Sequence, residues 1–265
     1  MDRLEQIAAT FAFQQSYGHV CEDTALARYV RNHALPDIWV ANHVSLVRAQ
    51  RAREIDDVLE RTEQALGHCT HRMFIVDALT PPAFVARLAL DGYSELSATL
   101  HMVLEGELRA PRATSELRPV EREDDWEAFY ELLRANHLEK LVHGLQLDEA
   151  ITRGVVAAHR AKLGAVQFFL AIVDGEPRAY GSSIVAPYGM GIVEDIFTLP
   201  AYRKRGLATT LIAHAIAYAR ARAMGPMLIG PVADEAPKAL YAALGFEPQC
   251  LTRQYMLDRE PATAS

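Results

Sequence analysis

The sequence predicts an α/β protein made of two similarly built halves. Half of the 265 residues are hydrophobic and 23% are charged, which is typical of a globular chain with a sizeable core. Apolar residues follow strand and helix periodicities in turn along the chain. The order strand, helix, strand, helix, strand occurs twice, and matching positions such as Leu88 and Tyr241 differ by 153 residues.

The second half carries the clearer pattern of elements. Trp126, Phe129 and Leu133 recur at helical spacing, and the Asp174-Gly175 turn joins two strands into a hairpin. Gly245 is placed to end a helix in the left-handed conformation. The expected elements are a helix at 123–141, strands at 167–173, 179–185 and 191–198, a helix at 204–223, a strand at 227–230, a helix at 236–244 and a strand at 251–257.

The first half repeats the last five of these elements. Residues 86–93 and 99–104 match residues 239–246 and 252–257, so we expect a tandem duplication. A polar segment with two prolines, residues 108–119, separates the halves and predicts domains at 1–115 and 116–265. The remaining matches place residues 39–46 opposite 192–199, residues 53–66 opposite 206–219, and residues 73–76 opposite 227–230.

Composition argues against several functional classes. The net charge of −7 disfavours a nucleic-acid binder, and no apolar run reaches membrane-spanning length. Three scattered cysteines do not make a disulfide framework, and the N-terminus lacks a signal-peptide pattern, so a cytoplasmic protein is expected. His68, Cys69 and His71 straddle a helix–strand junction without a fourth ligand nearby, so no metal site is expected.

A basic turn between a strand and a helix is the segment that points to chemistry. The strand ends near Thr198, three cations follow at positions 203–205, and Gly206 and Ala208 open a helix. The first turn of a helix has N–H groups without intrahelical partners, and its dipole favours an anion such as a pyrophosphate. A basic turn without a ligand is the simpler alternative. A Rossmann dinucleotide site is a weaker one, because its three-glycine spacing is absent.

Arg203-Lys-Arg-Gly-Leu-Ala208 resembles the acyl-CoA pyrophosphate signature, Arg/Gln-x-x-Gly-x-Gly/Ala, of the GNAT superfamily of N-acetyltransferases. The flanking Ile-Phe-Thr-x-Pro-x-Tyr and Leu240-Tyr-Ala-Ala-Leu-Gly-Phe246 are similar to the same family, over residues 116–258. The resemblance implies a twisted mixed sheet flanked by helices, splayed where the pantetheine arm of acetyl-CoA inserts, and here a tandem pair of such domains. It implies that Asp234, where many members have Asn, touches the cofactor. It also implies cofactor contacts from the backbone of Ile196, Phe197 and Thr198 and from the amides of Arg203, Lys204, Arg205, Gly206, Leu207, Ala208 and Thr209.

Acetyl transfer to an amine needs a base, and the thiolate that leaves gains from an acid. Glu194 and Asp195 are the candidate bases, although strand alternation sends them to opposite faces unless a bulge intervenes. We favour Glu194; the alternative is that both are ordinary solvated or capping acids. Tyr241 resembles the general acid of the family, and its alternative is a core aromatic residue.

The first half carries the pattern without this chemistry. Arg53 and Ile55 stand opposite Gly206 and Ala208, and Glu54 adds negative charge where a phosphate would bind. Leu88 stands opposite Tyr241, and Ala41 and Asn42 stand opposite the two acids. We expect the first half to shape the acceptor cleft as a degenerate repeat; an unrelated cap is the alternative.

The resulting expectation is an acetyl-CoA-dependent N-acetyltransferase that acts on a primary amine of a small molecule and uses no metal. The alternative is a non-catalytic acyl-CoA-binding regulatory or scaffold protein. The partners expected are the small-molecule amine and, as an option left open, a second copy of the chain as a homodimer, but neither nucleic acid nor a membrane.

Overall fold

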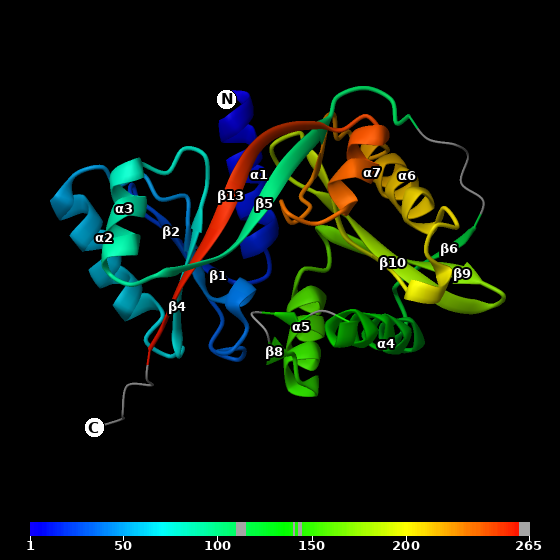
Figure 1. Ribbon diagram of the computed structural model, residues 1–265, viewed down its shortest axis with the longest axis horizontal. Coiled ribbons are helices and arrows are strands. Elements are labelled where there is room, and N and C mark those ends of the chain that lie inside the picture. Colours follow the sequence, from blue (N-terminus) through cyan, green and yellow to red (C-terminus); the bar gives the residue numbers. More distant parts are fainter. Residues whose placement is uncertain (110–114, 140, 143–144, 260–265) are drawn as a thin grey trace. The chain divides into compact units, whose positions relative to one another are not determined.

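The computed structural model describes residues 1–109, 115–139, 141–142 and 145–259, and the chain forms two compact units (Figure 1). Unit 1 contains Met1–His101, Pro231–Glu235 and the chain from Gln249 onward. Unit 2 contains Met102–Gly230 and Ala236–Pro248. No helix in the described part of the chain is both long and apolar enough to span a membrane.

Unit 1 is a sheet with helices packed on it. Its strands lie in the order β1-β2-β3-β4-β13-β5, with β3 and β4 parallel. The core of this unit includes Phe74 and Phe84, whose rings meet edge to face at 5.2 Å. Its elements are α1 (Arg3–Ser16), β1 (Val20–Asp23), β2 (Arg28–Arg31), η1 (Trp39–Ala41), β3 (His43–Ser45), α2 (Ala52–Ala65), β4 (His71–Val76), α3 (Pro82–Leu90), most of β5 (Ser94–Leu104) and most of β13 (Glu247–Asp258).

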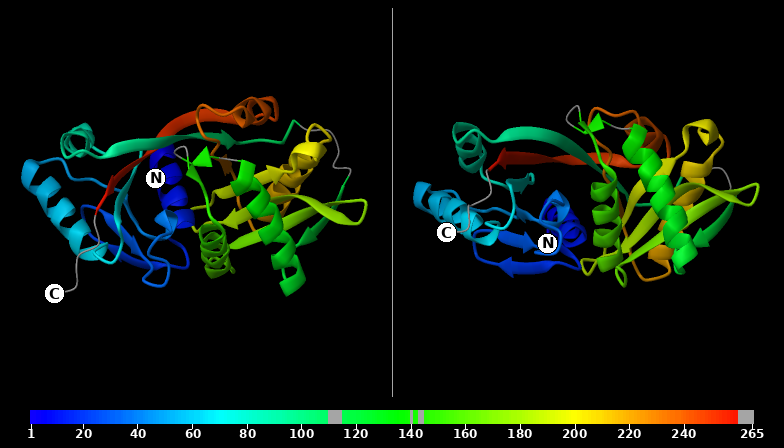
Figure 2. Two further views of the ribbon diagram at one scale, coloured as in Figure 1. Left: turned by 60° about the horizontal axis from the view of Figure 1, so that its bottom comes forward. Right: turned by 90° about the horizontal axis from the view of Figure 1, so that it is seen from below.

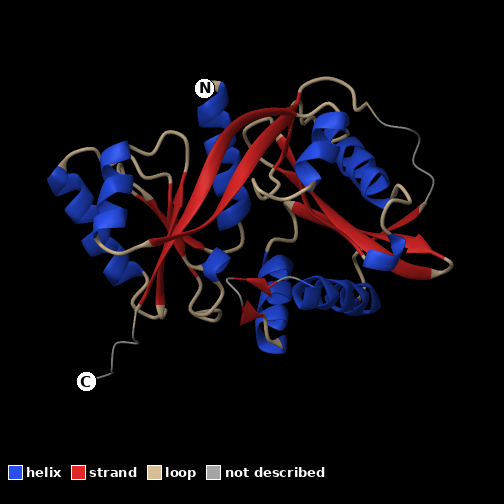
Figure 3. Cartoon of the chain, viewed as in Figure 1, coloured by secondary structure: helices blue, strands red, loops and turns tan. Residues whose placement is uncertain are grey.

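Unit 2 is also a mixed sheet, in the order β12-β11-β10-β9-β6, and only the β11–β12 pair is parallel among these strands (Figure 3). Its elements are β6 (Glu116–Pro119), α4 (Glu123–Glu139), β7 (Leu141–Val142), β8 (Leu145–Gln146), α5 (Glu149–Ala161), β9 (Val166–Val173), β10 (Glu176–Val185), β11 (Gly191–Thr198), η2 (Pro200–Tyr202), α6 (Leu207–Arg220), β12 (Met227–Ile229) and α7 (Pro237–Ala243).

Helices cover both faces of the unit 2 sheet. On β10, Tyr180 contacts Phe129 of α4, with ring centroids 4.9 Å apart. Ser183, on the opposite face by strand alternation, donates a hydrogen bond to the carbonyl of Ala215 in α6. Helices α4 and α5 lie side by side and share one face, while α6 covers the other (Figure 2).

The expected repeat is present in the order of the elements. The first half contains β3, α2, β4, α3 and β5, and the second contains β11, α6, β12, α7 and β13 in the same order. The last strands correspond closely, because Ser94–Leu104 and Glu247–Asp258 lie near the same offset of 153 residues that separates Leu88 from Tyr241. The tandem α/β architecture follows the sequence pattern.

The compact units do not coincide with a single division at residue 115. Residues 253–258 of β13, expected in the second domain, pair antiparallel with β4 in unit 1. Residues 102–104 of β5, expected in the first domain, pair antiparallel with β12 in unit 2. Periodicity predicts a strand but not its partner, so the sequence pattern could not assign these segments. Residues 110–114 of the expected linker lie outside the described residues.

Two helix boundaries differ from the sequence pattern. The helix expected from residue 204 begins at Leu207, because Lys204 (φ 60°) and Gly206 (φ 83°) take left-handed backbone conformations that a helix does not admit. The helix expected over 123–141 ends at Glu139, and residue 140 is outside the described part of the chain.

Candidate active site

The N-terminus of α6 is open to solvent. Gly206 is its N-cap, and a Cβ atom placed on Gly206 would meet nothing within 4 Å among the described residues. No described side chain caps this helix. The first hydrogen bond of the helical i to i−4 type joins the N–H of Thr210 to the carbonyl of Gly206. The preceding N–H groups, those of Leu207, Ala208 and Thr209, are the ones that an α-helix leaves without intrahelical acceptors.

Three cationic residues precede this opening along the chain. Arg203, Lys204 and Arg205 are all exposed. The guanidinium of Arg205 lies 5.0 Å from the ring centroid of Tyr202 and donates a hydrogen bond to the carbonyl of Ala201. Positive charge and free amides are the features that favour a diphosphate at a helix N-terminus.

The corresponding helix of unit 1 is closed by its own carboxylate. Glu54 accepts hydrogen bonds from the backbone N–H groups of Gln50 (2.9 Å) and Arg51 (3.0 Å) at the start of α2. These two bonds hold the pKa of Glu54 below its ordinary value. The end of α2 thus carries an internal anion, whereas the end of α6 has none among the described residues.

Strands β11 and β12 separate beside this opening. They pair only from Gly191 to Val193, while β11 continues to Thr198. The N–H of Leu199 bonds to the carbonyl of Arg178, so ladder alternation turns the backbone groups of Phe197 toward β10 and those of Thr198 away from it. The Oγ1 of Thr198 is also buried without a described partner. Of the three backbone positions implied by the resemblance, Thr198 therefore faces the open edge, and Phe197 does not.

A β-bulge interrupts β11 at the candidate bases. Tyr180 pairs with Phe197 and Ser182 with Glu194, so β11 holds one extra residue there, and Asp195 takes φ 56°. The hydroxyl of Ser182 lies 3.2 Å from the Glu194 carbonyl and 3.4 Å from Oδ2 of Asp195. The expectation of opposite faces is therefore corrected: register places Glu194 on the face of Ser182, and the bulge turns Asp195 to that same face.

Buried and half-buried polar groups gather on this face, below α4 and α5. Lys162, at the end of α5, is only 6% exposed. Burial lowers the pKa of Lys162, and the carboxylates of Asp195 and Glu194 oppose that shift. Burial likewise lowers the pKa of His159, whose ring meets that of Phe168 at 5.0 Å. The sequence pattern missed these two residues because it did not predict α5.

The other two predicted residues lie in different parts of the fold. Tyr241 belongs to α7 of unit 2, is 6% exposed, and has its ring centroid 6.3 Å from that of Phe246. Asp234 is exposed and belongs to the Pro231–Glu235 segment of unit 1. A cofactor contact by Asp234 rests on the resemblance alone.

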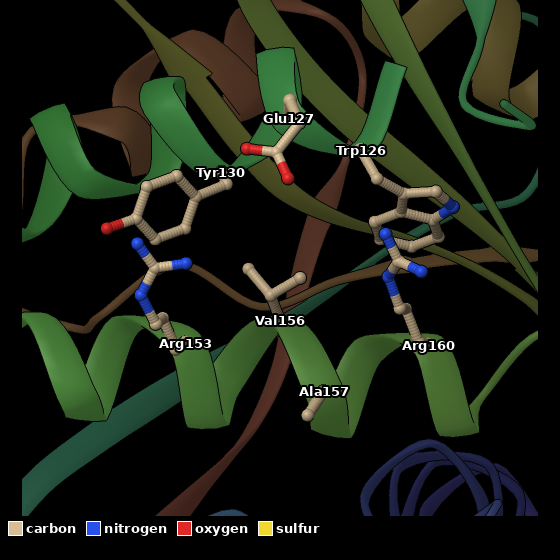
Figure 4. A pocket seen from close by; sticks show the side chains of 7 residues that line it. All are labelled: Trp126, Glu127, Tyr130, Arg153, Val156, Ala157 and Arg160. Atoms are coloured by element: carbon tan, nitrogen blue, oxygen red, sulfur yellow. The ribbon is translucent and has the colours of Figure 1, made fainter. Parts of the chain in front are cut away.

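A groove between α4 and α5 is a separate feature of unit 2. Trp126 and Tyr130 line one side, and Arg160 and Arg153 lie over their rings from α5, with Glu127 between them (Figure 4). Both arginines are already paired, Arg160 with Glu123 and Arg153 with Glu149. The groove is thus not a free anion site.

The two histidines near Cys69 have protein partners. Nε2 of His68 lies 2.9 Å from the side-chain oxygen of Asn42, and Nε2 of His71 lies 3.2 Å from the backbone carbonyl oxygen of Asn42. Within the described ranges, no group of three or more His, Cys, Asp or Glu side chains is arranged to hold a metal ion.

Comparison with known proteins relates part of the chain to a protein family. Residues 123–246 match the family model described as "Acetyltransferase (GNAT) family". The segment is a GNAT acetyltransferase domain. It contains the open end of α6, the bulged strand β11 and Tyr241, and its family and fold support acyl-CoA-dependent acetyl transfer. A search of curated proteins found no match.

Solved structures that match most of the chain include proteins described as GNAT. A GCN5-related N-acetyltransferase from Kribbella flavida matches with a TM-score of 0.68 and 17% identity, covering 98% of this chain and 97% of its own. A functionally unknown conserved protein from Staphylococcus epidermidis ATCC 12228 matches with a TM-score of 0.71 and 11% identity, covering 94% and 98%. A tandem GNAT protein from the clavulanic acid biosynthesis pathway matches with a TM-score of 0.57 and 17% identity, covering 89% and 79%.

Proposed function

We propose that this GNAT protein is an N-acetyltransferase that moves the acetyl group of acetyl-CoA to a primary amine of a small molecule by direct attack. One observation carries the proposal. The N-terminus of α6 is uncapped and open above Gly206, whereas the matching end of α2 is closed by Glu54. An end that keeps its amides free, beside the exposed cations Lys204 and Arg205, suits a diphosphate.

The binding roles follow from this opening. The backbone amides from Lys204 to Thr209 would hold the diphosphate, and a negative charge there gains from the helix dipole. The amide of Arg203, which the resemblance also implied, is not available, because its N–H donates a hydrogen bond of 3.3 Å to the carbonyl of Pro200. The backbone N–H of Thr198 would hydrogen-bond the pantetheine arm, because β12 no longer pairs with that edge of β11. The carbonyl of Thr198 already accepts a hydrogen bond from Arg203. Asp234 stays in this proposal only as a residue implied by the family resemblance.

The chemistry needs a neutral amine, because an alkylammonium ion has no lone pair. Glu194, or Asp195 beside it on the same face, would take the proton of the amine directly or through water. The amine nitrogen then attacks the thioester carbon, the new C–N bond forms, and the C–S bond breaks. The leaving thiolate of coenzyme A would take a proton from the hydroxyl of Tyr241. The second proton of the attacking nitrogen, which is lost as the amide forms, would pass through water and restore that hydroxyl.

Gly206→Glu tests the binding site directly. Glutamate would put a carboxylate and a strained left-handed residue at the opening, so acetyl-CoA binding measured by calorimetry should be lost. Gly175→Glu is the matched control, because Gly175 also has a positive φ (79°) and open space, but lies in the β9–β10 turn. Equal acetyl-CoA affinity in the two variants would refute the site.

Thiol release tests catalysis. Acetyl-CoA is offered with a panel of alkyl, aryl and amino-sugar amines, and free coenzyme A is titrated with a thiol reagent. We expect release that depends on one class of amine and is lost in Gly206→Glu. Tight cofactor binding without release for any amine would instead support the non-catalytic acyl-CoA-binding protein.

A further inference from the structure

The side chain of Arg203 is bound to other parts of the protein and is not available as a phosphate ligand. Its Nε donates a hydrogen bond of 3.0 Å to the carbonyl of Thr198, and its Nη2 lies 2.5 Å from the carboxylate of Glu139. The guanidinium also lies 5.9 Å from the ring centroid of Phe197. Arg203 therefore joins the end of β11 to the last residue of α4, while its own backbone begins the turn toward α6.

Glu139 occupies a position that its own helix disfavours. It is the last residue of α4, where the exposed carbonyls and the helix dipole already present negative charge. A carboxylate there gains stability chiefly from the Arg203 cation. The pairing with Arg203 is thus a specific feature of this turn and is not a consequence of helix capping.

The turn that follows Arg203 needs an anchor. Lys204 has φ 60°, which is unfavourable for a residue with a side chain, and Gly206 has φ 83°. A chain without other restraints would leave this conformation at Lys204, because a residue with a Cβ atom disfavours a positive φ. Holding the Arg203 side chain at both Thr198 and Glu139 fixes the first residue of the turn.

We propose that Glu139 is a positioning residue for the acyl-CoA turn: it holds Arg203 so that the amides from Lys204 onward are preformed for the diphosphate. The inference rests on the proposed acetyl-CoA site. Glu139 touches neither cofactor nor substrate in this role and acts through Arg203.

The direction in which Glu139→Gln changes the acetyl-CoA affinity distinguishes a positioning role from a simple charge effect. Removing a negative charge near a polyanionic cofactor should strengthen binding if charge alone matters, because repulsion falls and Arg203 is released. Positioning predicts the opposite. Glu139→Gln should therefore weaken acetyl-CoA binding by about threefold or more, in the range of measured exposed ion pairs. It should raise the KM for acetyl-CoA while kcat at saturating cofactor stays unchanged.

Controls are available on the same helix and at the same position. Glu131→Gln removes an exposed carboxylate from α4 that is not paired with Arg203 and should leave the affinity unchanged. Glu139→Asp should restore part of the affinity. In an Arg203→Met background, Glu139→Gln should have no further effect, because the partner of Glu139 is gone. Thermal unfolding of each variant confirms that the exposed substitutions leave the fold intact.

The outcomes separate this inference from the proposed function. If the unmodified protein binds acetyl-CoA and Gly206→Glu does not, the site stands. Tighter or unchanged acetyl-CoA binding in Glu139→Gln would then overturn the positioning role of Glu139 and leave the proposed site in place. Failure of the unmodified protein to bind acetyl-CoA would overturn both, and an undiminished effect of Glu139→Gln in the Arg203→Met background would show that Glu139 acts by another route.

Discussion

The carboxylate of Glu54 accepts a hydrogen bond of 3.0 Å from the backbone N–H of Arg51, and so closes the N-terminus of α2. The same oxygen accepts a second bond from the N–H of Gln50. At the equivalent place in the second half, Gly206 leaves the start of α6 open. Two helices of one repeated pattern thus differ in whether the protein supplies its own anion, and the acetyl-CoA site is proposed at the one that does not.

Glu54→Gln should therefore affect stability and leave the cofactor untouched. The hydrogen bonds lower the pKa of Glu54 in the folded protein. The carboxylate therefore stabilises the fold at pH values above the ordinary pKa of a glutamate, and this contribution is lost as the pH falls through the lowered pKa of the folded state. Thermal unfolding should show a small loss for the variant at pH 7 that shrinks toward pH 3. Acetyl-CoA affinity measured alongside should equal that of the unmodified protein; a weaker affinity would mean that α2 takes part in binding.

Substitution of each carboxylate in the β11 bulge tests which of the two is the catalytic base. Asp195 has φ 56°, a conformation that asparagine tolerates, so Asp195→Asn removes charge without adding strain. Glu194→Gln should lower kcat/KM by about 10²–10⁴, the usual loss of a general base, and Asp195→Asn should lower it much less. The deficit of Glu194→Gln should shrink as the pH approaches the pKa of the amine. The reverse ranking of the two variants would make Asp195 the base.

Tyr241→Phe tests the proton donor. Tyr241 is buried beside Phe246, and phenylalanine keeps the ring that fills this site while removing the hydroxyl. Turnover should fall, while acetyl-CoA affinity should change little, because no binding role is assigned to the hydroxyl. Stopped-flow measurement of thiol release with calorimetric Kd values gives both quantities. Unchanged turnover would show that Tyr241 is a core aromatic residue and not the proton donor.

The stability of the fold should fall at mildly acidic pH because of His101. Its side chain is fully buried, its Nε2 lies 2.7 Å from the hydroxyl of Thr252, and burial lowers its pKa to about 4. The unfolded chain binds this proton near pH 6.5, so the folded state loses stability as the pH falls from 6.5 toward 4, at up to about 1.4 kcal/mol per pH unit.

Urea unfolding between pH 4 and 7 measures this loss, which should reach about 3 kcal/mol. His101→Gln removes the titrating ring, so its stability should depend less steeply on pH over the same range. The slope that remains is expected from other buried histidines such as His71, whose pKa burial also lowers. An equally steep profile in the variant would show that His101 does not control acid unfolding.

Local pattern predicted much of the fold. The order of β11, α6, β12, α7 and β13 could be read from apolar periodicity, because each element buries its own stripe or face. The same pattern missed α5. The short cationic turn before α6 was also visible in the sequence, since glycine and charge mark a helix start that can hold an anion. The backbone angles of that turn were not, because Lys204 is not a residue type that favours a left-handed conformation.

By itself, the sequence determined the repeated element order, the basic glycine-containing turn before α6 and the absence of that turn from the first half, because these depend on residue type and spacing along the chain. The tertiary structure decided the partners of β13 and β5, the shared face of Glu194 and Asp195, and the meeting of Arg203 with Glu139. Those relationships join segments far apart in the chain or depend on one extra residue in a strand register. Only packing energy between distant elements selects them, and local sequence carries no signal of it.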